Sequence, residues 1–187
     1  MTTWFTADTH FGHRAILEYT DRIDATVEEM DERLVAVWNS IVLPGDTVWH
    51  LGDFSFHKRA EAQTLFDRLN GAKHLVAGNH DNRQARNLGW ESVSDLHTVK
   101  VDTDDGRFEA VLCHYPLMTW NRAQHGRVHL HGHSHGNIAQ ASTRFDVGWD
   151  GLGTWMTGFG QRLASAEQIM FHIHDRGSEY VPVDHHA

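Results

Sequence analysis

The stretch Arg127–Asn137, RVHLHGHSHGN, decides how this chain is expected to fold and where its chemistry lies. Histidines occupy every second position from 129 to 135, and glycines at 132 and 136 enclose the last pair. Alternation with a period of two is typical of a β-strand, whereas the glycine after His131 predicts that the strand ends and a loop begins. We predict that His129 and His131 are strand residues used for packing or for support of a ligand, and that His133 and His135 are nitrogen ligands presented by the loop.

Length and composition favour one domain over residues 1–187, with a mobile tail at 173–187. The net charge is −9, and among the sixteen basic residues the lysines are few, which argues against a complex with long nucleic acids. The single cysteine, Cys113, cannot form an internal disulfide, and no apolar run reaches membrane-spanning length. The N-terminal residues lack the features of a signal peptide. We therefore expect a cytoplasmic protein without a membrane partner, and the oligomeric state stays open.

Upstream of the histidine stretch, strand and helix patterns alternate. Strands are predicted over residues 2–7, 47–51 and 72–77, and amphipathic helices over 26–41, which opens with a capping box at Thr26–Glu29, and over 58–70. Residues 93–101 and 107–113 form a predicted hairpin. Downstream, we predict a strand over 143–149, a glycine-rich loop over 151–161 and a short helix or strand over 165–171. This order predicts a layered α/β domain.

Polar side chains follow five of the predicted strands. They are Asp8, His10, Asp53, Asn79, His80, His114, His133 and His135. Because functional groups gather at the carboxyl ends of strands in α/β domains, we expect these side chains to meet. The set exceeds what one tetrahedral zinc needs, and without thiolates it favours two divalent ions that share a bridging carboxylate. Manganese is favoured, with iron, nickel or zinc as alternatives.

The same residues fall into five ordered motifs between residues 8 and 135. They read D-x-H (Asp8, His10), G-D (Gly52, Asp53), G-N-H-D (Gly78 to Asp81), a lone histidine (His114) and G-H-x-H (Gly132 to His135). This set resembles the calcineurin-like metallophosphoesterases. The resemblance implies a two-sheet β-sandwich flanked by helices, in four αββα layers, over a single domain.

The resemblance also implies a role for each motif residue. One metal ion would be held by Asp8, His10, Asp53 and His135. The other would be held by Asp53, Asn79, His114 and His133. His80 would stay off both metals and face the substrate.

Charge and resemblance together predict a phosphoric ester hydrolase, with a phosphodiesterase favoured. Two divalent ions and two aspartates leave the inner site with a charge of about +2, which attracts a phosphodiester monoanion. A metal-bridging hydroxide would attack a small phosphodiester or nucleotide, and His80 would protonate the leaving oxygen as general acid. Substrate contacts are predicted for Arg14, Asn79 and Arg83, with surface ion pairing as the alternative for the two arginines.

Departures from the family pattern narrow the substrate. Asp53 is followed by Phe54-Ser55-Phe56-His57, whereas the protein Ser/Thr phosphatases carry a second aspartate and an arginine there, so a phosphoprotein phosphatase is disfavoured. The same departure leaves open what orients His80, with Asp81 as one option. The short chain is similar to the small bacterial and phage phosphodiesterases of the family. Alternatives are a phosphomonoesterase, an inactive binding scaffold like the related retromer subunit, and a single-metal storage or regulatory protein.

Two further sets of residues carry weaker expectations. The aromatic residues Trp120, Trp149, Trp155 and Phe159 are predicted to be core, with the wall of a base-binding pocket as the alternative. The histidines without motif support are predicted to be structural or solvated; they are His13, His50, His57, His74, His97 and His125.

Overall fold

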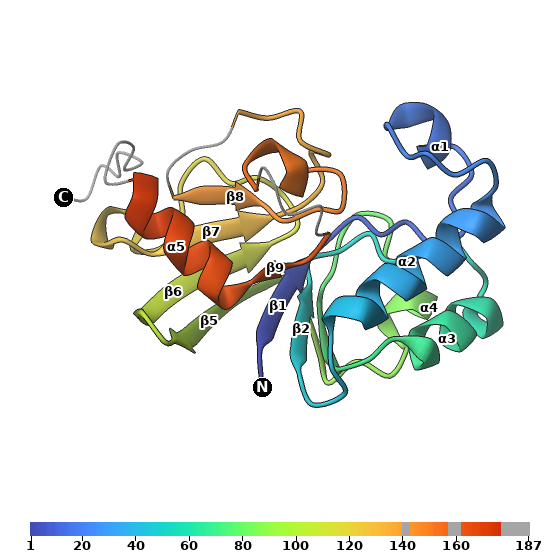
Figure 1. Cartoon of the computed structure of the whole chain (residues 1–187), viewed down its shortest axis with the longest axis horizontal. Coiled ribbons are helices and arrows are strands. Elements are labelled where there is room, and N and C mark those ends of the chain that lie inside the picture. Colours follow the sequence, from blue (N-terminus) through green and yellow to red (C-terminus); the bar gives the residue numbers. More distant parts are fainter. Residues whose placement is uncertain (140–142, 157–161, 177–187) are drawn as a thin grey trace.

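The structure, a computed structural model, describes residues 1–139, 143–156 and 162–176 and is an α/β fold with two mixed sheets and flanking helices (Figure 1). The first sheet has the strand order β4-β3-β2-β1-β9. Its first four strands are parallel neighbours and β9 runs antiparallel to β1. The bounds are β1 (Thr3–Thr6), β2 (Thr47–His50), β3 (Ala72–Val76), β4 (Ser92–Ser94) and β9 (Ala164–Ser165).

The second sheet has the order β5-β6-β7-β8. Strands β5 and β6 form an antiparallel hairpin, and β7 and β8 add to it in parallel. The bounds are β5 (Leu96–Thr103), β6 (Gly106–Cys113), β7 (Val128–His131) and β8 (Arg144–Asp146). The hairpin and the strands at residues 128–131 and 144–146 confirm the pattern predicted for the second half of the chain.

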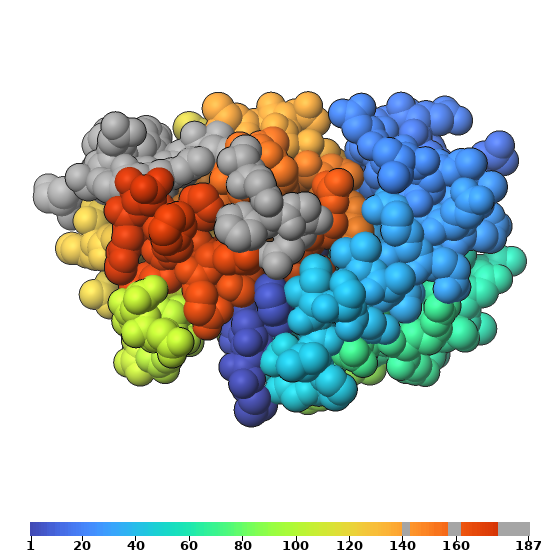
Figure 2. All heavy atoms as spheres, in the orientation of Figure 1, coloured from blue at the N-terminus to red at the C-terminus, as the bar shows by residue number. Residues whose placement is uncertain are grey.

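The two sheets pack face to face around one hydrophobic cluster. Phe5 and Trp49 of the first sheet share this cluster with Leu112, Leu130 and Phe145 of the second. The helix α5 (Ala166–Arg176) adds Ile169 and Met170 to the same cluster and contacts β5 and β9. In the space-filling view, β1 lies between α5 and the segment that joins α2 to β2 (Figure 2).

Helices cover the other face of the first sheet. The helices α2 (Val27–Ile41) and α3 (Arg59–Arg68) pack Leu34, Trp38 and Phe66 against Val48 of β2 (Figure 1). The predicted capping box is present in part, because Thr26 Oγ1 accepts a hydrogen bond from Glu29 N at 3.2 Å. On the outer face of the second sheet, Val111 packs against Leu117, Trp120 and Ala123.

Short elements complete the described ranges. They are α1 (Ile16–Tyr19), α4 (Arg83–Arg86) and two 3-10 helices at Ala123–His125 and Leu152–Thr154. The second 3-10 helix lies in the predicted glycine-rich loop, whose residues 157–161 fall outside the described ranges. None of the described helices combines the length and the apolar character needed to cross a bilayer.

Two predictions about elements were wrong in detail. The strand predicted over residues 93–101 is divided between the sheets, since Val93 pairs with Leu75 of β3 whereas Leu96 pairs with Cys113 of β6. The chain therefore changes sheets at Asp95. The helix α5 continues to Arg176, so residues 173–176, predicted as tail, are its last turn; Ile173 packs against the core, and residues 177–187 lie outside the described ranges.

Candidate metal centre

Two groups of three side chains lie where strands of both sheets end. One group is Asp8, His10 and His135; the other is Asp53, His114 and His133. Within each group the potential ligand atoms all lie within 4.8 Å of one another. Asn79 reaches the second group, because its Oδ1 lies 3.1 Å from His114 Nε2. The structure therefore brings together all seven residues that the sequence predicted as metal ligands.

Backbone hydrogen bonds beyond the strands hold these loops together. Asp8 N donates to Gly52 O at 2.9 Å and His10 N donates to Asp53 O at 3.0 Å, so the loops after β1 and β2 stay paired. Gly132 N donates to His114 O at 3.0 Å and joins the loops after β6 and β7. Each polar side chain thus leaves a backbone that is fixed by the neighbouring strand end.

Asp53 stands between the two groups. Its Oδ2 lies 3.4 Å from His114 Nε2 and 3.8 Å from His10 Nε2. Its Oδ1 accepts a hydrogen bond from His80 N at 2.9 Å. Burial would raise the pKa of Asp53, but the hydrogen bond and charge of His114 outweigh it and lower that pKa to about 2. A charged carboxylate between two imidazole sets is the arrangement that a shared ligand requires.

Strained backbone is concentrated at these positions. Asp8, His10, Asp53, His133 and His135 have φ values of 55°, 53°, 58°, 67° and 47°, and the only other described non-glycine residue in this left-handed region is Arg122. Such conformations are costly for residues with a Cβ atom, and they cluster at functional sites. The strain is thus found at five of the seven predicted ligands.

Close packing also requires glycine beside the predicted ligands. A Cβ atom at Gly132 would lie 2.8 Å from Asp8 Oδ2 and 2.5 Å from Ala7 Cβ. A Cβ atom at Gly52, where φ is +94°, would lie 2.6 Å from His114 Nδ1. These glycines therefore allow the backbone to approach the carboxylate and the imidazole closely.

The histidine tautomers suit metal binding through Nε2. His114 Nδ1 donates to Leu51 O at 2.8 Å and His135 Nδ1 donates to Asp150 Oδ2 at 2.9 Å, so Nε2 is the nitrogen of each ring that would bind a metal ion, after it gives up its proton. His10 is 2% exposed, and its Nε2 is buried with no hydrogen-bond partner among the described residues. Burial lowers the pKa of His10 to about 2, so this ring is neutral. A buried polar atom without a partner is costly, and a bound cation would satisfy it.

Asp8 shows the complementary demand for positive charge. It is fully buried, and burial raises its pKa to about 7 although the charges of His135 and His114 oppose that shift. Its carboxylate accepts a hydrogen bond from His133 N at 2.9 Å. A cation beside Asp8 would favour the ionised form of this carboxyl group.

An arginine and an aspartate support the Asp8 side of the centre. Arg22 Nη2 donates to Asp8 O at 2.7 Å and Nη1 donates to Thr9 O at 2.8 Å. The same guanidinium pairs with Asp150, with Nε to Oδ1 at 3.0 Å and Nη2 to Oδ2 at 2.8 Å. Asp150 in turn accepts a hydrogen bond from His135, so the Arg22–Asp150 pair fixes both the backbone at Asp8 and Thr9 and the ring of His135. Sequence reasoning missed both residues, and the D-V-G-W-D pattern at 146–150, at the end of the strand predicted over 143–149, was the only signal.

His80 lies at the open side of the centre. Its side chain is 44% exposed, and its Nε2 is 4.0 Å from Asp53 Oδ2. Asp81 does not orient this ring, because its carboxylate accepts hydrogen bonds from the backbone of Asp53, Phe54 and Gly78 at 2.8, 3.0 and 2.8 Å. Asp81 instead fixes the Gly52–Phe54 loop.

An aromatic group lies beside His80. The rings of His13 and Phe56 stack with centroids 3.8 Å apart, and Phe56 lies 4.8 Å from the ring of His80. His13 Nδ1 is 3.3 Å from His10 Nδ1. The prediction of His13 as merely structural or solvated therefore missed its place at the site. On the second group, Tyr115 lies 4.9 Å from the ring of His133 and is 45% exposed.

The remaining predictions have different outcomes. Trp120, Trp149 and Trp155 are 6%, 1% and 3% exposed, as expected for core, and Phe159 lies outside the described residues. Within the described ranges, no hydrogen bond or ion pair joins the side chain of Arg14 or Arg83 to either group. Their contact with substrate stays a prediction.

Comparisons with known proteins identify relatives without a described activity. No profile of a known protein family matches the chain. A crystal structure of a protein of unknown function from Aquifex aeolicus superposes with a TM-score of 0.63 over 91% of this chain and 98% of that one, at 19% identity, which shows a shared fold. An uncharacterized protein of Methanocaldococcus jannaschii is 32% identical over 70% of this chain and 68% of its own length.

Two phage proteins are also similar to this chain. The gene 66 protein of Mycobacterium phage D29 is 32% identical over 74% of this chain and 81% of its own. The gene 66 protein of Mycobacterium phage L5 is 30% identical over 92% of this chain and 96% of its own. The chain therefore belongs to the family of the gene 66 protein of Mycobacterium phage L5.

Proposed function

We propose that this protein is a dinuclear metal-dependent phosphodiesterase with the four-layer fold of the calcineurin-like metallophosphoesterases. The observation that carries the proposal is the position of Asp53, whose Oδ2 lies 3.4 Å from an imidazole of one group and 3.8 Å from an imidazole of the other. One carboxylate shared by two ligand sets is the feature of two-metal sites that act on phosphate esters.

The donor atoms fit two divalent ions. Each group combines carboxylate oxygen with two imidazole nitrogens, and Asn79 adds an amide oxygen to the second. Such mixed sets without thiolate suit manganese, iron, nickel or zinc, of which we favour manganese. Cations at these positions would satisfy both the Nε2 atom of His10, which has no partner among the described residues, and the buried carboxyl group of Asp8.

Different side chains of the site would bind the ions, orient a ligand ring and donate a proton. Two bound divalent ions supply Lewis acidity, which polarises phosphate oxygens and makes water a better nucleophile. Asp150 keeps the Nδ1 proton of His135 in place, so this ring presents Nε2. His80 is exposed at the open side and protonates the leaving oxygen, which is the step that an alkoxide leaving group needs most. A small diester, which carries one negative charge, is the preferred substrate.

The test combines metal analysis with three esters. Wild type, Asp53→Asn and His80→Ala are loaded with Mn²⁺, and metal content is measured by elemental analysis. Turnover is then measured with bis-p-nitrophenyl phosphate, p-nitrophenyl phosphate and the dinucleotide thymidylyl-thymidine. We expect two ions per chain, faster cleavage of the diesters than of the monoester, and loss of both metal and turnover in Asp53→Asn.

His80→Ala separates the general acid from the ligands. We expect it to keep two ions and to lose about 100-fold in turnover of the dinucleotide, with a smaller loss for p-nitrophenolate, which leaves without a proton. His125→Ala is the matched control, since this exposed histidine lies in the 3-10 helix at Ala123–His125. Loss of metal in His80→Ala would contradict its assigned role. No turnover of any ester with Mn²⁺, Fe²⁺, Ni²⁺ or Zn²⁺ would favour a binding scaffold, and dominant monoester turnover would favour a phosphomonoesterase.

A further inference from the structure

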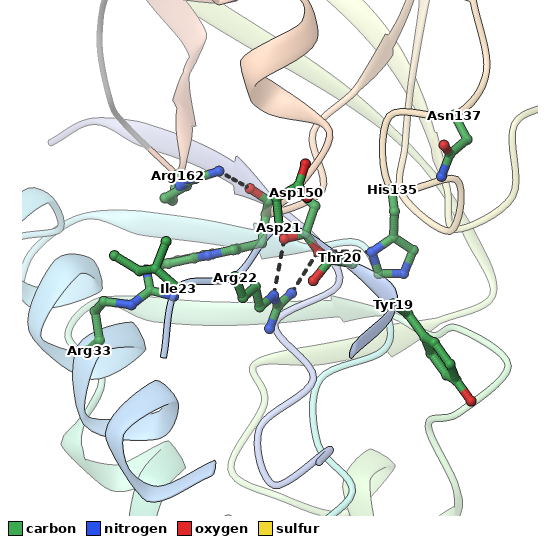
Figure 3. Close-up of a pocket in the computed structure, with 11 residues that line it drawn as sticks. Tyr19, Thr20, Asp21, Arg22, Ile23, Arg33, His135, Asn137, Asp150 and Arg162 are labelled. Atoms are coloured by element: carbon green, nitrogen blue, oxygen red, sulfur yellow. Dashed lines mark hydrogen bonds and ion pairs between the residues drawn. The ribbon is translucent and has the colours of Figure 1, made fainter. Parts of the chain in front are cut away.

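A cavity of about 360 Å³ adjoins the Asp8 side of the metal centre (Figure 3). His135 and Asp150, which belong to that centre, form part of its wall. In Figure 3, Arg33 and Arg162 lie across the cavity from His135 and Asn137. A volume of this size lies within the range of sites that hold small organic ligands. The cavity therefore offers space for a group attached to a phosphate held at the metal centre.

The wall of this cavity is rich in arginine although the chain is acidic overall. Three arginines (Arg22, Arg33 and Arg162) line it against two aspartates, Asp21 and Asp150, in a chain of net charge −9. The guanidinium of Arg22 is fully used, because it bonds to Asp150 and to the backbone of the Asp8 loop. Arg22 and Asp150 therefore neutralise each other, and Asp21 is exposed to solvent.

The other two arginines keep donor groups free. Arg33 forms a two-point ion pair with Asp24 through Nε at 2.6 Å and Nη2 at 2.5 Å, which offsets its charge, and its Nη1 has no acceptor among the described residues. Arg162 donates through Nη1 to Trp149 O at 2.9 Å, and no described carboxylate pairs with it. Guanidinium groups with unused donors bind phosphate well. Two of them therefore line the cavity that His135 also lines.

The rest of the wall suits a polar organic group with one flat or apolar face. Thr20 and Asn137 line the cavity and offer hydrogen-bonding groups. Tyr19 and Ile23 also line it and are 75% and 88% exposed, so they form its rim rather than part of the core. This mixture matches a nucleoside, which has a polar sugar and an aromatic base.

We propose that this cavity binds the nucleoside of a nucleotide substrate and that Arg33 and Arg162 bind a second phosphate on that nucleoside. The inference rests on the proposed phosphodiesterase function and names its substrate class. The phosphodiester to be cleaved lies at the metal centre, beside His135. The second phosphate lies at the far end of the cavity. The preferred substrates are thus nucleotide diesters that carry another phosphate, such as dinucleotides with a terminal phosphate.

The first measurement uses two esters that differ only in the second phosphate. These are thymidine 5′-(p-nitrophenyl phosphate) and the same compound with a 3′-phosphate. With the Mn²⁺-loaded protein we expect the 3′-phosphate to raise kcat/KM about 10-fold or more. In Arg33→Gln and Arg162→Gln the gain falls to about 2-fold or less, while turnover of the ester without the 3′-phosphate stays close to wild type. Arg59→Gln, at the exposed start of α3, is the matched control and keeps the full gain.

The second measurement needs no catalysis. Isothermal titration calorimetry of the metal-free protein compares thymidine 3′,5′-bisphosphate with thymidine 5′-monophosphate, and we expect the bisphosphate to bind about 10-fold more tightly in wild type and in Arg59→Gln only. Lysine variants at 33 and 162 keep the charge and should restore part of the preference, provided that thermal unfolding shows an intact fold.

The outcomes distinguish the two proposals. Hydrolysis of both esters with no 3′-phosphate effect, or with the same effect in all variants, would overturn the cavity assignment and leave the phosphodiesterase intact. A preference for the bisphosphate in calorimetry without hydrolysis of either ester would support the cavity and overturn the enzymatic function.

Discussion

The two pairs of histidines in the stretch Arg127–Asn137 lie in different structural environments. His129 and His131 belong to strand β7 and are 0% and 2% exposed. His129 Nδ1 donates to Val111 O at 2.9 Å, and His129 Nε2 accepts from Leu117 N at 3.0 Å. His133 and His135 follow in a loop with φ values of 67° and 47°, and each stands beside an aspartate carboxylate in one of the two ligand groups.

The difference lies in the backbone rather than in the residue type. In the strand, the nitrogens of His129 are used by backbone groups, and burial lowers the pKa of His129 and of His131 to about 4, so both stay neutral as parts of the core. In the loop, the left-handed backbone turns two alternating rings toward different carboxylates. Imidazole rings of this stretch are thus either packed in the core or placed as candidate metal ligands, according to the backbone conformation of their residue.

Removal of a loop ring should have the largest effect. We expect His135→Ala to lower the metal content from two ions toward one and the phosphodiester turnover about 1,000-fold, because a lost ion removes several kcal/mol of transition-state stabilisation. Elemental analysis and a diesterase assay with Mn²⁺ check this. If His135→Ala keeps two ions and its turnover stays within 10-fold of wild type, then His135 is not a required metal ligand, and the proposed difference between the loop and strand histidines is wrong.

Removal of the group that holds His135 should have a smaller effect. Asp150→Asn weakens the hydrogen bond to His135 Nδ1, and we expect metal affinity to fall about 10- to 100-fold. The measurement is a competition with a metal chelator at pH 7.5. Asp95→Asn, which breaks an exposed ion pair with Arg86, is the control and should leave metal affinity unchanged. Equal affinities for Asp150→Asn and wild type would show that His135 needs no such support.

His129 and His131 of β7 should affect the stability of the fold at acidic pH rather than the metal content. The pKa of His129 is about 4 when folded and about 6.5 when unfolded, so between these values the unfolded chain binds more protons. The stability that His129 contributes is complete above pH 6.5 and is lost as the pH falls toward 4. Between pH 7.5 and 5 the protonation of this residue alone should lower the free energy of unfolding by about 2 kcal/mol.

Chemical denaturation of the metal-free protein between pH 7.5 and 5 measures that loss. In His129→Gln the dependence on pH should be flatter by about 2 kcal/mol over the same interval, whatever the stability of the variant at pH 7.5. Identical pH dependence in both proteins would mean that His129 is protonated in the fold, contrary to its hydrogen bonds.

The sequence was sufficient to predict that the seven candidate ligands lie together, because each follows a strand whose end the sequence pattern predicts. Asp8, Asp53, Asn79 and His114 each follow an apolar run, and parallel strands end at the same edge of a sheet. The contacts of Arg22 and Asp150, which hold the Asp8 loop and His135, could not be predicted from the sequence. Arg22 and Asp150 are separated by 128 positions, and no local pattern relates them.

The predicted strand boundaries were wrong where one alternating segment pairs with strands of both sheets. The alternation over residues 93–101 suits one long strand, yet Ser92–Ser94 pairs with the edge of β3 and the residues from Leu96 onward pair with β6. Competition between two sheet edges is a tertiary effect that no window of the sequence contains. His13 was missed in the same way, because its contacts with His10 and Phe56 depend on the loops after β1 and β2 lying together.

The left-handed backbone conformations at the proposed metal centre have a consequence for protein design. Five side chains with a Cβ atom occupy a backbone region in which each costs about 1–3 kcal/mol, so the surrounding framework must compensate for that cost. A designer who copied Asp8, His10, Asp53, His133 and His135 onto relaxed loops of another scaffold would reproduce the residues and lose the directions in which they point. A designer would have to copy the hydrogen-bonded loops as a whole, including Gly52 and Gly132, where the backbone closely approaches His114 and Asp8.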